Sequence, residues 1–130
     1  MILIGHPYID FEALEKITKK EDIANTSSNA VVVFDFHHDN IPLCHYVEEN
    51  AVLFALFVKE ERDIILASVL GATYIICDKT LVKTAQTFAD DYLFDAKILL
   101  YSKNEEDIEY AAHNSVDGIL FDKGIKDGSN

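Results

Sequence analysis

Short apolar runs alternate along the whole chain with segments whose apolar residues have helical spacing. The runs are rich in Val, Ile and Leu and do not alternate with polar residues, which is typical of strands covered on both faces. They comprise residues 2–4, 30–34, 51–58, 73–77, 97–101 and 118–121. This alternation predicts an α/β fold with a parallel sheet of five to six strands flanked by helices.

The helix-like segments begin at residues suited to helix starts. Asp10 can cap a first helix that places Phe11, Leu14 and Ile17 on one face. Further helices are predicted over residues 42–49, 60–70, 80–92 and 105–112. Because crossovers between parallel strands are right-handed, two architectures remain open: a flavodoxin-like three-layer sandwich, or a (β/α) half-barrel in which consecutive strands are adjacent.

Length and composition favour one folded unit. With 130 residues, of which 49% are hydrophobic, the chain is long enough to bury a core. We predict a single α/β domain over residues 1–123, followed by a polar tail, residues 124–130, that contributes little to the core. Cys77 lies within an apolar run and Cys44 in a separate segment, so we expect two buried, unlinked thiols.

The net charge of −12 excludes some classes of partner. A phosphate backbone would be repelled, so the sequence argues against nucleic-acid binding. Anionic membrane surfaces are disfavoured for the same reason, and no apolar run reaches the roughly 18–20 residues that cross a bilayer. The first residues lack the features of a signal peptide, so we expect a cytoplasmic protein.

Late in the chain, within residues 96–123, an apolar motif, a helical motif and a second apolar motif follow one another: KILLY, NEEDIEYAAHN and VDGILFD. This segment resembles the later β/α units of phosphate-binding (β/α)8-barrel enzymes. The resemblance covers about a fifth of the chain and implies a fold of parallel β/α units. The glycine-rich phosphate loops of that family are absent from the sequence, so its activity does not follow.

Polar residues come directly after most of the predicted strands. Since the carboxyl ends of parallel strands meet at one edge, and ligands bind beyond that edge, a site is predicted there. The residues concerned are His6, Asp35, His37, His38, Asp39, Asp78, Lys79, Ser102, Lys103, Asp122 and Lys123. We expect a small ligand to be bound by His6, Asp35, His37, Asp78, Lys79, Asp122 and Lys123.

The segment after residues 30–34 suggests a divalent metal ion as a cofactor. In an extended chain Asp35, His37 and Asp39 point to one side, and carboxylates with imidazole suit zinc, iron or manganese. This metal hypothesis requires that the extended conformation continue past Phe36.

Two function classes are compatible with these residues. The first is a binding or interaction module with a small-ligand or metal site at the carboxyl edge of the strands. The alternative is a small lyase- or isomerase-like enzyme acting on an anionic metabolite at the same edge, with lysines for charge and a histidine as proton shuttle. Exposure of the apolar residues 52–58 or 92–94 would favour a homo-oligomer.

Overall fold

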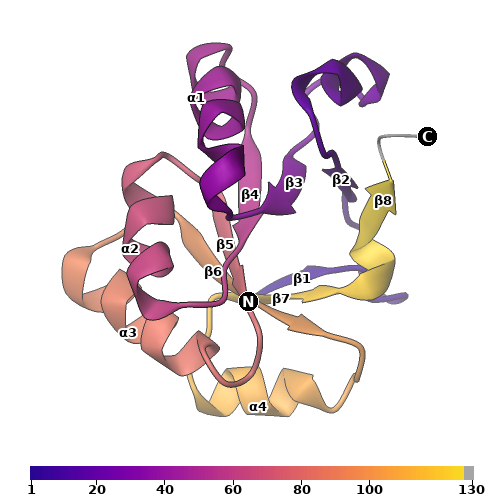
Figure 1. Ribbon diagram of the computed structural model, residues 1–130. Helices are drawn as coiled ribbons and strands as arrows, with labels where there is room; N and C mark the ends of the chain where they lie inside the picture. The colour runs from indigo at the N-terminus through magenta and orange to yellow at the C-terminus, as the bar shows by residue number, and fades with distance from the viewer. Residues whose placement is uncertain (128–130) are drawn as a thin grey trace.

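The computed structural model describes residues 1–127 and shows a parallel sheet of eight strands curled into a half-barrel (Figure 1). The strands are β1 (Ile2–Ile4), β2 (Leu14–Lys16), β3 (Val32–Asp35), β4 (Phe54–Phe57), β5 (Tyr74–Cys77), β6 (Lys97–Ser102), β7 (Gly118–Phe121) and β8 (Ile125–Asp127). Their order across the sheet is β1-β7-β6-β5-β4-β3-β2-β8. The α/β class and the parallel sheet are confirmed, with more strands than the five to six predicted.

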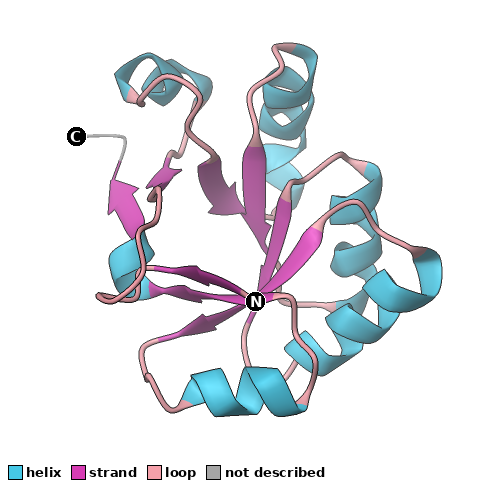
Figure 2. Ribbon diagram, turned by 180° about the vertical axis from the view of Figure 1, so that it is seen from behind, coloured by secondary structure: helices cyan, strands magenta, loops and turns pink. Residues whose placement is uncertain are grey.

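Consecutive strands are adjacent from β2 to β7, as the half-barrel alternative predicts. The helices are α1 (Ile41–Glu49), α2 (Glu61–Val69), α3 (Val82–Tyr92) and α4 (Asp107–His113), and they lie around the outside of the curled sheet (Figure 2). A flavodoxin-like sandwich has helices on both faces of its sheet, which is not the arrangement here. None of the helices among residues 1–127 combines the length and apolar character needed to cross a membrane.

Two apolar clusters hold the sheet. The outer cluster packs the helices against outward-facing strand residues such as Val32, Ile75 and Ile98. The inner cluster fills the concave face with one buried side chain from each of seven strands: Ile4, Leu14, Val33, Ala55, Ile76, Leu99 and Leu120. Since the concave face is filled at mid-height by these side chains, a ligand can approach it only at its ends.

The first predicted helix is wrong, because residues 14–16 form strand β2. Leu14 belongs to the inner cluster and Ile17 to the outer one. A spacing of three puts two side chains on one face of a helix but on opposite faces of a strand, so the apolar pattern alone does not distinguish them. Between β2 and β3 the chain forms only a short 3-10 helix, η1 (Lys20–Asn25).

The predicted polar tail contains structure. After β7 the chain makes a 3-10 turn, η3 (Asp122–Gly124), and then forms β8, which pairs with β2. Ile125 packs against the inner cluster. Residues 128–130 of the predicted tail lie outside the described residues.

The apolar runs that could support self-association differ in exposure. Phe54, Ala55 and Leu56 are buried in β4, so this run is core, whereas Tyr92 and Leu93 at the end of α3 are exposed. The thiols of Cys44 and Cys77 are free and buried, as predicted.

Candidate functional site

The carboxyl ends of the strands surround a hollow, which we call the mouth hollow. Its volume is about 450 Å³, and it lies above the inner cluster. It is lined by Lys16, Asp35, Phe57, Lys59, Tyr101, Asp122, Ile125 and Asp127. Within their strands, Lys16, Asp35, Phe57 and Tyr101 each lie two residues beyond an inner-cluster residue, so alternation along the strand turns them inward.

Two aromatic rings line the mouth hollow. Phe57 ends β4 and Tyr101 lies near the end of β6, with ring centroids 5.6 Å apart and planes at 87°. Both side chains also pack against the inner cluster. The rings therefore form an apolar floor, and the charged ends of Lys16, Lys59 and Asp35 belong to the rim.

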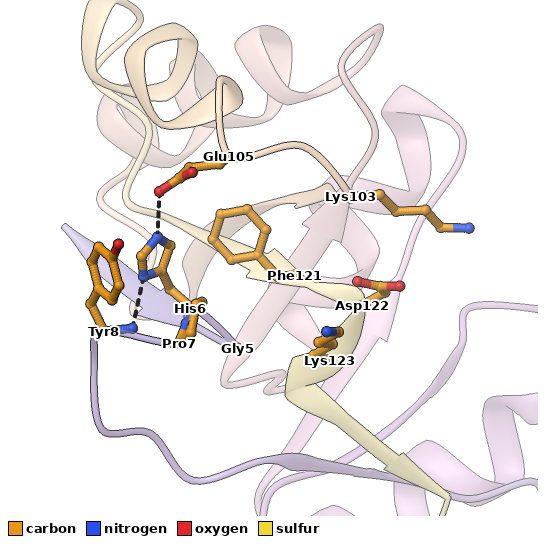
Figure 3. A pocket seen from close by; sticks show the side chains of 9 residues that line it. All are labelled: Gly5, His6, Pro7, Tyr8, Lys103, Glu105, Phe121, Asp122 and Lys123. Atoms are coloured by element: carbon orange, nitrogen blue, oxygen red, sulfur yellow. Dashed lines mark hydrogen bonds and ion pairs between the residues drawn. The ribbon is translucent and has the colours of Figure 1, made fainter.

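A second hollow, the side hollow, adjoins the first at Asp122. It has a volume of about 270 Å³ and lies over the ends of β1, β6 and β7 (Figure 3). It is lined by Gly5, His6, Pro7, Tyr8, Lys103, Glu105, Phe121, Asp122 and Lys123. Figure 3 shows His6 between Tyr8 and Glu105, with Lys103, Asp122 and Lys123 on the side away from the imidazole.

Both ring nitrogens of His6 are engaged, and the residue is only 6% exposed. The backbone N–H of Tyr8 donates to Nδ1 at 3.1 Å, so the ring proton resides on Nε2. Nε2 donates in turn to Oε1 of Glu105 at 2.9 Å. Proton transfer to or from a ligand would first require one of these bonds to break, so the geometry assigns His6 a positioning role rather than that of a proton shuttle.

Four lysines line these two hollows. Lys16 and Lys59 line the mouth hollow and Lys103 and Lys123 the side hollow, and none of the four forms an ion pair with another residue of the described chain. Glu105 is already paired with His6, and Asp127 has an interaction of its own. A neutral imidazole leaves the charge of Glu105 in place, so four lysines balance four carboxylates and the two hollows are formally neutral, in a chain whose net charge is −12.

Lys79 and Asp78 lie at the same edge but outside both hollows. Nζ of Lys79 is 2.7 Å from Oδ1 of Asp107, and Oγ of Ser102 donates to Oδ2 at 2.6 Å. These contacts hold the pKa of Asp107 below its usual range, the lysine being the larger cause, and the bond to Asp107 raises the pKa of Lys79. Asp78 accepts from the backbone N–H and hydroxyl of Thr80 before α3. Lys79 therefore stabilises the start of α4, and Asp78 stabilises the turn that leads into α3.

The structure does not support the predicted metal ligands. His37 accepts a hydrogen bond from the backbone N–H of Asp39 at its Nδ1, and the chain then enters the 3-10 turn η2 (His38–Asn40). The extended conformation therefore stops before Asp39, and the expected alternation is lost. His37 lies in a groove beside α2, whereas Asp35 lines the mouth hollow. Across residues 1–127, no three His, Cys, Asp or Glu side chains form a group that could hold a metal ion.

Of the predicted ligand-binding residues, the structure places His6, Asp122 and Lys123 in the side hollow and Asp35 with Asp122 in the mouth hollow. It does not bring His37, Asp78 or Lys79 to either. Sequence reasoning missed Lys16, Phe57, Lys59, Tyr101 and Glu105. Alternation along a strand could have identified Phe57 and Tyr101, since each lies two positions after an inward-facing residue. Lys16 was missed because residues 14–16 were predicted to be helical rather than a strand.

The two thiols cannot serve as nucleophiles in this conformation. Burial raises the pKa of Cys44 to about 11 and that of Cys77 to about 12. At neutral pH both remain protonated, and a thiol is a weak nucleophile compared with its thiolate.

No protein-family model matches the sequence, and a search of curated proteins returns no match.

Proposed function

We propose that this protein binds a small anionic molecule that carries a flat apolar group, and that the mouth hollow is its site. One observation carries the proposal: an aromatic floor, Phe57 and Tyr101, lies within the same hollow as Lys16 and Lys59. The two lysines form no ion pair with any residue of the described part of the chain. Such a combination suits a ligand with one apolar face and one anionic end.

Each part of the hollow has a counterpart in that ligand. A flat group gains contact with the floor rings. A carboxylate or phosphate accepts charge-assisted hydrogen bonds from the ammonium groups of Lys16 and Lys59. The carboxylates of Asp35 and Asp122 accept from hydroxyl or amine groups of the ligand. The volume of about 450 Å³ falls within the roughly 300–1,000 Å³ common for small-molecule sites.

The charge of the whole chain makes this edge selective for anions. At −12, most of the surface repels an anion. At the two hollows the four lysines equal the carboxylates in number, which offsets that repulsion locally. An anionic ligand is therefore favoured at the carboxyl edge of the strands over other parts of the surface.

Binding is the function that this geometry supports better than catalysis. The enzyme alternative relied on a histidine as proton shuttle, and both nitrogens of His6 are occupied. An enzyme at this edge would instead depend on Asp35 and Asp122, the two carboxylates at the hollows without a described partner.

The test is a titration of the purified protein with phenyl phosphate, which has a ring and an anionic end, followed by NMR of the backbone amides. We expect saturable shifts at Phe57 and Tyr101. Lys59→Met should weaken binding about tenfold, the effect of losing one charge-assisted contact. Lys97→Met is the matched control, because Lys97 is an exposed lysine at the opposite, amino-terminal end of β6.

Two further probes define the chemistry. Inorganic phosphate lacks the ring and should bind more weakly than phenyl phosphate. Benzylamine has the ring with a positive charge and should not compete. Absence of saturable shifts with phenyl phosphate, or tighter binding of benzylamine, would contradict the proposed function.

A further inference from the structure

We propose that residues 7–13, which connect β1 to β2, form a movable cover for the carboxyl-edge site, anchored by His6 and Glu105. The ligand-closing role of this cover rests on the function proposed above, whereas the anchor can be tested without any ligand. His6 and Glu105 act as positioning residues, and Tyr8 is the residue of the cover that contacts the ligand.

The connection is held to the protein through very few contacts. Within the described chain, residues 7–13 form two hydrogen bonds with the rest of the protein, and both go to His6. The backbone N–H of Tyr8 donates to Nδ1, and that of Ile9 donates to the carbonyl oxygen of His6 at 3.1 Å. Residues 7–12 are all exposed. A segment with so few hydrogen bonds to the rest of the protein, and with every residue from 7 to 12 exposed, opens at low free-energy cost.

His6 itself is fixed firmly, so it can act as an anchor. Its ring is buried, lies 5.0 Å from the ring of Tyr8 in an edge-on arrangement and 5.9 Å from that of Phe121. Glu105, from the loop between β6 and α4, holds the other nitrogen. This contact links residues 99 positions apart in sequence, and so ties the start of the connection to the loop that follows β6 (Figure 3).

The connection carries apolar side chains that are wholly or partly exposed to solvent. Tyr8 is 86% exposed, and Ile9 and Phe11 are also exposed. Tyr8 lines the side hollow, which meets the mouth hollow at Asp122. A ligand with a flat apolar group in this region would give the ring of Tyr8 a surface to cover. The exposed residues of the connection therefore complement the same ligand class as the floor rings.

Limited proteolysis with chymotrypsin, which cleaves after Tyr and Phe, tests the anchor on the protein alone. Cleavage after Tyr8 and Phe11 is followed by mass spectrometry in the wild type and in Glu105→Ala. We expect the variant to be cleaved about threefold to tenfold faster at these sites, because proteolysis follows the population of the open segment. Cleavage after the core residue Phe54 should stay unchanged, since only the connection is released.

Two matched variants complete the test. Glu105→Gln keeps an oxygen that accepts from Nε2 of His6 and should behave like the wild type. Glu106→Ala removes the neighbouring exposed carboxylate and should also leave the rate of cleavage unchanged. Equal cleavage in Glu105→Ala and the wild type overturns the proposal, and so does a parallel increase after Phe54, which reports global unfolding.

The ligand-closing role is tested with phenyl phosphate by hydrogen–deuterium exchange. We expect slower exchange in residues 7–13 at saturation, and Tyr8→Ala should weaken phenyl phosphate binding about threefold while leaving inorganic phosphate unaffected. Binding without any change in exchange of residues 7–13 overturns the cover but leaves the binding function intact. If phenyl phosphate does not bind, the binding function fails and the proteolysis decides on the anchor.

Discussion

Gly5 and Gly124 approach so closely that a Cβ atom on Gly5 would lie 2.5 Å from the backbone nitrogen of Gly124. Gly5 directly follows β1, and Gly124 ends the turn that leads into β8. The reciprocal approach is equally tight, because a Cβ on Gly124 would lie 2.7 Å from the carbonyl oxygen of Ile4. The contact brings the end of one edge strand of the sheet to the start of the other.

Gly5→Ala is therefore expected to destabilise the protein by about 2–4 kcal/mol, from the combined cost of a positive φ and a backbone clash. Gly71→Ala is the matched control. Gly71 has nearly the same φ, +98° against +102°, but its nearest neighbour is a flexible side-chain carbon 3.5 Å away. Urea unfolding should show a clearly smaller loss for Gly71→Ala, and equal losses would contradict the close approach.

Because side chains fill the concave face, we expect a large loss of stability when the Leu99 side chain is shortened. This side chain is fully buried in the inner cluster, so Leu99→Ala should reduce the free energy of unfolding by about 2–5 kcal/mol. Leu53→Ala removes the same atoms from an exposed position just before β4 and should change it by less than about 0.5 kcal/mol. A small effect at Leu99 would mean that the concave face is poorly packed.

The link between Lys79, Ser102 and Asp107 predicts acid sensitivity. Because the folded protein lowers the pKa of Asp107, the carboxylate stabilises the fold above its unfolded-state pKa. That contribution is lost as the pH falls through the lowered folded-state value. Asp107→Asn should cost about 1.5–3 kcal/mol at pH 7, the usual range for hydrogen bonds to a charged group. The difference from the wild type should shrink below pH 4; a difference independent of pH would argue against the ionised pair.

The raised thiol pKa values predict unreactive cysteines. In the folded protein at pH 8, neither Cys44 nor Cys77 should react with a thiol-specific disulfide reagent on the time scale of minutes, since both are buried and protonated. Both should react at once in denaturant. Rapid labelling of one thiol in the native protein would show that its surroundings open readily.

The sequence predicted α1 to α4 from apolar residues at helical spacing, and six of the strands from short, continuous apolar runs. It failed for β2, where Leu14 and Ile17 are three residues apart and satisfy either a helix or a strand that is buried on both sides. Strand β8 was missed since Ile125-Lys126-Asp127 has a single apolar residue. Pairing with β2 and contact of Ile125 with the inner cluster stabilise it, and neither is a local property.

The candidate site was predicted at the correct edge but with partly different residues. Any residue following a strand counted as a candidate, although loops after parallel strands also provide helix caps. Asp78 has that role, and Lys79 pairs with Asp107. The partner of His6 could not be predicted, because Glu105 is 99 residues away and reaches the imidazole only once β1 and β6 lie on either side of β7.

The placement of the edge strands sets the order in which the protein can be assembled. β1 pairs with β7, where Ile2 lies opposite Gly118, and β2 pairs with β8, where Leu14 lies opposite Ile125. During synthesis the first strand leaves the ribosome long before its neighbour exists. Pairings of such wide sequence separation slow folding. The segments from β3 to β7 can form their adjacent pairs early, whereas the carboxyl-edge site is completed last.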